Sequence, residues 1–169
     1  MRSICLLPAL FAFAGTLAVS AEPGPECAPV LKAMAKTLQS DHATVTTMDN
    51  RTTNGITAGG VNYLQFDGGW RVSRMSPKDN QQQSEENLRN AKSYTCQALP
   101  DSSVDGTAVA NYKARTVAQE AVVDSIISIS KATGLALRVE NTIDTGDGTK
   151  KSYSTRYTYE GVRAPAVQK

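Results

Sequence analysis

Few residues of this 169-residue chain have the types and spacings that catalysis requires. His42 is the only histidine and opens a threonine-rich stretch, so we expect a structural residue at a strand edge. Glu85 and Glu86 are adjacent in a polar segment, so their side chains point in different directions. Asp101 and Asp105 flank a predicted turn, and turn formation explains them better than catalysis does. The motifs of serine hydrolases, zinc proteases, P-loops and dinucleotide-binding folds are absent. We therefore predict a non-enzyme without cofactor or metal; a hydrolase with an unrecognised site is the enzymatic alternative.

A short acidic stretch at 143–152, IDTGDGTKKS, invites comparison with a calcium-binding loop. A calcium loop has acidic residues at alternate positions and a closing glutamate, and this stretch has neither. We interpret it as a solvated hairpin turn.

The N-terminus has the layout of an export signal. Arg2 precedes an apolar run over residues 4–19, and Val19, Ser20 and Ala21 are small enough for signal peptidase. The alternative, a membrane anchor, requires a longer apolar span of about 20 residues. We predict cleavage after Ala21. Residues 22–169 then form a single domain that is periplasmic or secreted and does not span the membrane after processing.

Two cysteines, Cys27 and Cys96, remain after removal of the predicted signal peptide, which contains Cys5. In an exported protein an isolated pair is most simply a disulfide. The alternatives are a redox or metal pair, but the sequence has no CxxC, and one histidine with two thiolates leaves a zinc site incomplete.

The net charge of +2 gives no reason to expect a nucleic-acid partner.

Local patterns place a helix first and strands after it. Apolar residues at helical spacing predict an amphipathic helix over 29–39, and β-branched residues predict a strand over 42–49. Asn-Gly and Gly-Gly predict a bend within 51–60. We predict a hairpin over residues 61–75 that turns at Asp67-Gly68-Gly69. For residues 76–92 we predict a short surface helix or a helix-containing loop.

From Ser93 onward the sequence predicts an antiparallel meander whose first link is Pro-Asp at 100–101. Alternation with a period of two divides its last three strands into an apolar and a polar face. The predicted apolar set is Val123, Ile127, Ile129, Leu135, Leu137, Val139, Ile143, Tyr153, Tyr157 and Tyr159. The helix at 29–39 is the candidate to cover this face, which makes the fold class α+β.

Several segments in this order resemble the LolA-like superfamily of periplasmic lipoprotein carriers and their relatives. They are YLQFDGGWRVSRM at 63–75, VDGTAVANYKAR at 104–115, ISKATGLALRVE at 129–140 and a final tyrosine-rich strand. Within the third, the family's turn is matched by Ser130, Gly134, Leu135, Leu137 and Arg138. The resemblance implies an incomplete β-barrel, a strongly curved antiparallel sheet covered by the N-terminal helix and a short helix-containing loop. In the carriers this fold encloses a cavity for acyl chains.

Large side chains of the predicted strands are the candidates for contact with an apolar ligand. They are Tyr63, Trp70, Tyr112, Ile127, Ile129, Leu135, Leu137 and Tyr157. The alternative is that they form core and cross-strand pairs. The resulting hypothesis is a periplasmic binding protein that carries or senses a lipid, a lipoprotein acyl chain or another apolar ligand. The alternative is an envelope interaction module with a packed interior, whose partner is another protein.

Overall fold

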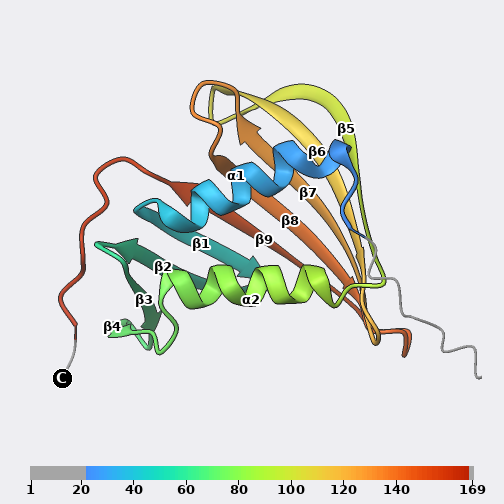
Figure 1. Cartoon of the computed structure of the whole chain (residues 1–169). Helices are drawn as coiled ribbons and strands as arrows, with labels where there is room; N and C mark the ends of the chain where they lie inside the picture. The colour runs from blue at the N-terminus through green and yellow to red at the C-terminus, as the bar shows by residue number, and fades with distance from the viewer. Residues whose placement is uncertain (1–21, 168–169) are drawn as a thin grey trace, which may run out of the picture.

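The computed structural model describes residues 22–167, and the predicted signal peptide lies outside them. A short 3-10 helix, η1 (Pro25–Cys27), leads into α1 (Ala28–Gln39), and α2 (Pro77–Arg89) follows the first four strands. The strands are β1 (His42–Met48), β2 (Arg51–Ala58), β3 (Val61–Phe66), β4 (Gly69–Val72), β5 (Ser93–Val104), β6 (Thr107–Val117), β7 (Val122–Ser130), β8 (Ala136–Asp144) and β9 (Lys150–Thr158). Figure 1 shows α1 and α2 on the same side of a strongly bent sheet.

The nine strands form one antiparallel sheet in the order β4-β3-β2-β1-β9-β8-β7-β6-β5. Two meanders, β1–β4 and β5–β9, are joined by the pairing of β1 with β9, from Ala43 opposite Thr158 to Met48 opposite Tyr153. The sheet is not closed, because β4 and β5 remain its two edges. The predicted α+β class and the incomplete barrel are confirmed.

Local chemistry explains both helices and the first hairpin. In α1 the buried residues Val30, Ala33 and Thr37 recur every three or four positions, which gives one stripe facing the sheet. Ser76 caps α2 through a capping box with Asp79. These helices agree with the predicted segments 29–39 and 76–92. The predicted turn between β3 and β4 is also confirmed, since Asp67 and Gly68 have φ angles of 48° and 79°.

The bend predicted within 51–60 is present at Gly59-Gly60, but no bend occurs at the other signal, Asn54-Gly55. Both residues lie inside β2, where Gly55 pairs with Thr44 on one side and Leu64 on the other. A Cβ on Gly55 would lie 2.6 Å from the Thr44 hydroxyl oxygen. The glycine therefore permits close side-chain packing and makes no turn here, while the predicted Gly-Gly signal does turn the chain between β2 and β3.

The link predicted at Pro100-Asp101 is also wrong, because β5 continues through it to Val104. The register shifts between Leu99 and Ser102, and β5 is an edge strand, where a missing proline N–H is tolerated. The actual turn is Asp105-Gly106. Beyond the shift, the tip of this hairpin reaches other strands, because Asp105 forms an ion pair with Arg156 of β9 at 3.4 Å.

The predicted alternation in β8 fails at its first residues. A register shift between Ser128 and Ile129 places Ala136 opposite Ile129, and Ala136 is fully buried. Leu135 and Leu137 are only half-buried. The shift gives β8 one residue more than β7 between these two pairs, so Leu135 and Leu137 do not take the inward positions that the alternation predicted. The odd position Val139 is again part of the core under α1.

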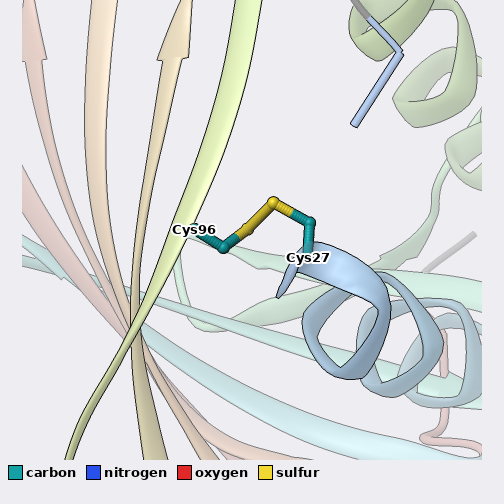
Figure 2. The surroundings of a disulfide bond; sticks show 2 residues. All are labelled: Cys27 and Cys96. Atoms are coloured by element: carbon teal, nitrogen blue, oxygen red, sulfur yellow. A yellow bond between two sulfur atoms is a disulfide. The ribbon is translucent and has the colours of Figure 1, made fainter. Parts of the chain in front are cut away.

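The core lies between α1 and the strands β6, β7 and β8, as predicted for the covering helix. Its buried members are Val30, Ala33, Ala114, Ile127, Ile129, Ala136 and Val139. Three of them are alanines, which lets the helix approach the sheet closely. At the start of α1, Cys27 is joined to Cys96 of β5 with a Cα–Cα separation of 5.1 Å, as Figure 2 shows. The predicted disulfide is thus present in the structure.

Replacing both Cys27 and Cys96 with alanine is expected to lower the free energy of unfolding by about 4 kcal/mol, because the disulfide closes a long loop in the unfolded chain. Urea unfolding of the two proteins measures this difference. Peptide mapping under non-reducing conditions provides the control by identifying the Cys27–Cys96 peptide pair. Equal unfolding midpoints for the variant and the oxidised protein would contradict the expectation.

Candidate functional site

A groove of about 400 Å³ lies between α1, the strands β6 and β7, and the turn that links β7 to β8. We call it the α1 groove. Its lining residues are Pro29, Lys32, Ala33, Lys36, Ala110, Tyr112, Ile129, Ser130, Lys131, Ala132, Thr133 and Gly134. The groove runs beside the buried stripe of α1, on the same face of the sheet as the core.

The floor of the α1 groove is apolar. Ala110 and Ile129 stand opposite each other on β6 and β7, and Tyr112 packs against the core one position further along the same face. Ala33 contributes from the helix. Because two of these residues are alanines, space remains between helix and sheet that larger side chains would fill.

Lysines form the rim. Lys32 and Lys36 are four residues apart and therefore neighbours on one face of α1. The Lys36 ammonium donates to the carbonyl of Thr133, and Lys131 forms an ion pair with Asp101. The chemical arrangement is an apolar floor with a cationic edge.

The β7–β8 turn holds one wall of the groove in place. The N–H of Gly134 donates to the Ser130 carbonyl at 2.8 Å, and the N–H of Thr133 donates to the Ser130 hydroxyl at 3.2 Å. Gly134 has a φ of 69°, a conformation that favours glycine. The N–H of Lys131 donates to the carbonyl of Ala108 at the start of β6.

A buried hydroxyl connects this wall to the helix. Thr37, fully buried in the last turn of α1, accepts a hydrogen bond of 3.0 Å from the N–H of Ala136. The Tyr159 hydroxyl lies 3.3 Å from the same oxygen and donates to the Ala136 carbonyl. The Thr37 junction, which comprises Thr37, Ala136 and Tyr159, joins α1, the start of β8 and the segment after β9.

His42 belongs to a ring cluster beside this junction. Its ring centroid lies 5.5 Å from that of Tyr157 and 6.2 Å from that of Tyr159. Nδ1 is 2.7 Å from the Ser40 carbonyl, and Nε2 is 3.4 Å from the Thr57 hydroxyl. His42 is the first residue of β1, at the predicted strand start, but the partial exposure expected there is wrong, because the residue is only 7% exposed and β1 is an inner strand. The prediction failed because β2 and β9 cover both sides of β1.

The eight predicted ligand contacts are dispersed. Tyr112 and Ile129 line the α1 groove, and Ile127 lies in the core next to it. Leu135 and Leu137 flank Ala136 at the irregular start of β8, and Tyr157 packs against the core. Residues opposite each other in an antiparallel pair share a face. Tyr63 is opposite Ile56 and Trp70 is opposite Gln65, which places both on the face away from α1.

The rim lysines were not among the predicted contacts. Lys32 and Lys36 were visible in the sequence at a spacing that puts them on one helix face. Lys131 belongs to a turn whose position under α1 depends on the register shift in β8. The sequence could therefore have indicated the pair Lys32 and Lys36, but not the position of Lys131.

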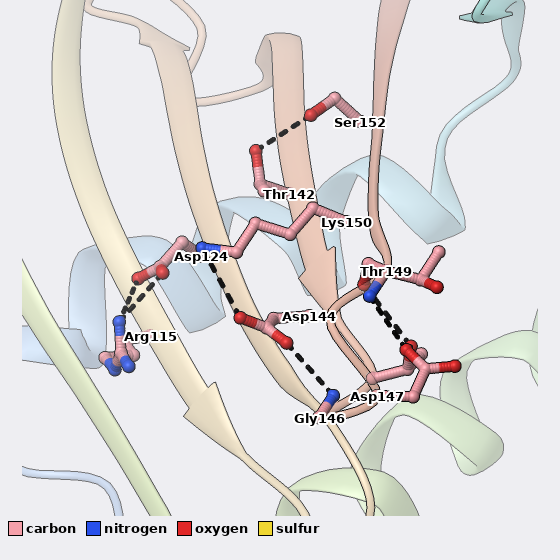
Figure 3. Close-up of polar contacts among 10 residues, drawn as sticks. Arg115, Asp124, Thr142, Asp144, Gly146, Asp147, Thr149, Lys150 and Ser152 are labelled. Carbon is pink, nitrogen blue, oxygen red and sulfur yellow. Dashed lines mark hydrogen bonds and ion pairs between the residues drawn. The ribbon is translucent and has the colours of Figure 1, made fainter.

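A second, shallower depression of about 640 Å³ lies on the opposite face of the sheet. Asp124 accepts from Arg115 at 2.8 Å, and Glu140 is paired with Arg138. Figure 3 shows the Arg115–Asp124 pair and, on the neighbouring strands, the hydroxyl groups of Thr142 and Ser152 bonded to each other. Two of the carboxylates that line this depression, Asp124 and Glu140, are thus already paired with arginines, as on a solvated surface.

The acidic turn between β8 and β9 is also satisfied internally. The N–H of Gly146 lowers the pKa of Asp144, and hydrogen bonds from Thr145 and Thr149 lower that of Asp147. Figure 3 shows the contacts of Asp144 with Gly146 and of Asp147 with Thr149. Among residues 22–167, no group of three His, Cys, Asp or Glu side chains is placed to hold a metal ion. In the same range, no helix has the length and apolarity needed to cross a membrane.

No protein-family model matches the chain, and no curated protein sequence matches it. Among solved structures it is similar to the lipoprotein LppX of Mycobacterium tuberculosis, at 15% identity, with 82% of this chain and 97% of that chain covered and a TM-score of 0.47. LprF of Mycobacterium bovis matches at 10% identity, 86% and 99% coverage and a TM-score of 0.49. MucB matches at 12% identity and a TM-score of 0.47, and the chain spans 62% of its length. These likenesses concern the fold alone.

Replacing Thr37 with valine is expected to lower the free energy of unfolding by about 1–3 kcal/mol, because the buried N–H of Ala136 loses its acceptor. Thr37→Ser keeps the hydroxyl and is the matched control, with a smaller loss. Urea unfolding compares the two variants. A serine variant as unstable as the valine variant would show that the hydroxyl contributes nothing.

Alkaline pH is expected to destabilise the fold through its buried tyrosines. Burial, with the nearby Tyr159 and Tyr153, raises the pKa of Tyr157 to about 12 from 10.0. Below pH 10 the phenol is neutral in both states; between pH 10 and 12 the unfolded chain ionises first, so the free energy of unfolding falls. Unfolding midpoints measured from pH 8 to 12 should therefore fall less steeply for Tyr157→Phe. An identical pH dependence in both proteins would refute this assignment.

Proposed function

We propose that the protein is a non-enzymatic binding protein of the cell envelope that holds an apolar ligand, such as a lipid acyl chain, in the α1 groove. The observation that carries this proposal is an apolar floor left uncovered between a helix and the sheet on which it packs. The volume of about 400 Å³ lies within the ~300–1,000 Å³ typical of small-molecule sites.

The groove is better supported as a ligand site than as a packing defect. The backbone of its turn wall is fixed by several hydrogen bonds, and the helix wall is fixed at the Thr37 junction. Walls held in this way do not collapse onto each other when the space between them is empty. Such preorganisation lowers the cost of binding, because little of the protein must be ordered by the ligand.

The location follows from the disulfide and the predicted signal. A disulfide between Cys27 and Cys96 persists in oxidising compartments such as the periplasm or the extracellular space. Together with the predicted cleavage after Ala21, this supports an exported protein that meets its ligand outside the cytoplasm.

The arrangement of titratable groups supports binding over catalysis. His42 is buried among tyrosines and hydrogen-bonded to a backbone carbonyl, and within residues 22–167 it has no carboxylate partner. A general base requires access to a substrate proton and a group that orients it. His42 has no such access.

A second candidate, a surface for an envelope protein, is favoured by another observation. Met48, Leu64 and Phe66 lie on the helix-facing side of β1 and β3, yet they are 43%, 36% and 49% exposed. Helix α2 leaves them exposed and has no buried residue of its own. Apolar side chains left open on a sheet face can contact a protein partner.

Filling the groove tests the first candidate. Ala110→Leu places a larger side chain on the groove floor, and we expect it to weaken the binding of the neutral probe N-phenyl-1-naphthylamine at least about tenfold. Ala118→Leu, an exposed position just after the end of the same strand and outside the groove, is the control and should bind like the unaltered protein. Fluorescence titration gives both affinities.

Native mass spectrometry of protein recovered from the periplasm without detergent complements this titration. A co-purifying lipid that is absent from Ala110→Leu supports the proposal. Protein that carries no lipid, takes up none when it is added and does not bind the probe would refute the groove as a ligand site and favour the protein-interaction candidate.

A further inference from the structure

We infer that the ligand of the α1 groove is a single-chain amphiphile with an anionic headgroup, and that Lys32 and Lys36 bind this headgroup at the rim. The inference rests on the proposed function and adds the chemical class of the ligand. The shared chemistry is a carboxylate or a phosphate monoester at the end of one apolar chain.

The charge of the lining is the first argument. The groove is lined by three lysines and by no aspartate or glutamate. The whole chain is nearly balanced, with 18 basic and 16 acidic residues. A local excess of positive charge beside an apolar floor is therefore a property of this site, and it attracts anions from solution.

The three lysines differ in how far their charge is already used. Lys131 is paired with Asp101, so its charge is largely neutralised. The Lys36 ammonium donates to the Thr133 carbonyl, which leaves its charge uncompensated. Lys32 is exposed and, among residues 22–167, forms no ion pair or hydrogen bond. Lys32 and Lys36 are thus the two cations available to a ligand.

A lysine at position 32 does not stabilise helix α1. Lys36 lies in the last turn of α1, where a cation interacts favourably with the helix dipole. Lys32 lies near the middle of the helix, where that interaction is absent, and like charges four residues apart destabilise a helix. An anion bound between the two ammonium groups would remove this repulsion.

The geometry assigns separate places to the apolar chain and to the headgroup. The floor of Ala33, Ala110, Tyr112 and Ile129 has no charge, and the lysines meet it at the helix side. Lysine methylene groups extend along apolar surface while the ammonium remains in water. The apolar chain would lie on the floor, with its charged end at Lys32 and Lys36.

Matched ligands test the headgroup. Dodecanoic acid, dodecyl phosphate and dodecanol share one chain and differ in charge, and calorimetric titration below their aggregation limits gives each affinity. We expect both anions to bind at least about fivefold more tightly than the alcohol, and this preference to shrink when the salt concentration rises. Acetate and inorganic phosphate test whether the anion alone is sufficient.

Charge variants test the residues. Lys32→Glu should remove most of the preference for the anions, lowering their affinities by much more than that of dodecanol, and Lys32→Arg should retain the preference. Lys78→Glu, which changes the net charge by the same amount on α2 outside the groove, is the control. Circular dichroism spectra establish that each variant is folded.

The outcomes separate the two proposals. Anion preference that depends on Lys32 and not on Lys78 supports the inference. Equal binding of acid, phosphate and alcohol, blocked by Ala110→Leu, overturns the headgroup assignment and leaves the groove as an apolar site. Binding of inorganic phosphate as tightly as dodecyl phosphate overturns the amphiphile. Absence of binding by all three ligands overturns the proposed function and the inference together.

Discussion

The hydrogen bond between the Thr37 hydroxyl and the Ala136 N–H is the contact on which the arrangement of helix and sheet depends. The register shift at the start of β8 leaves this N–H without a strand partner in a buried place, where an unpaired donor is costly. The Thr37 hydroxyl of α1 is its acceptor, and the Tyr159 hydroxyl from beyond β9 lies near the same threonine oxygen and donates to the Ala136 carbonyl. Together with the disulfide and the Lys36–Thr133 hydrogen bond, this contact fixes the orientation of the helix, because apolar packing alone provides no directional contacts.

The groove follows from that orientation. Held at Thr37 near one end and at the disulfide near the other, α1 crosses β7 and β8 with one stripe of small residues facing down. The strip of sheet beside this stripe, at Ala110 and Ile129, remains uncovered, and the lysines of the adjacent helix face stand above it. Apolar floor and cationic rim therefore arise from two neighbouring faces of the same helix. This proximity links the chemistry of the rim to the fold, because rotating the helix would separate the lysines from the floor.

Much of this fold could be predicted from local signals in the sequence, and the site could not. The helical spacing from Val30 to Thr37 and the Asp67-Gly68 turn are signals that act within a short segment. The isolated cysteine pair is not local, but it allows only one pairing. The Asn54-Gly55 pair misled because its glycine serves a contact with Thr44 across the sheet. Pro100 misled because tolerance of proline depends on being at the sheet edge, which only topology decides. The groove combines residues of α1 with a turn about a hundred positions later, and its wall depends on a one-residue shift that no periodicity reveals.

The residues that α1 contacts lie far along the chain from it, and this separation has a consequence for folding. Thr37 contacts residues 99 and 122 positions later in the chain, and Cys27 is bonded 69 positions ahead. Contacts of such separation are slow to form, because long loops must close before any stabilisation results. A chain delivered from its N-terminus cannot seat its first helix until its last strands have emerged. The core between α1 and the sheet is therefore completed only when almost the whole chain is available.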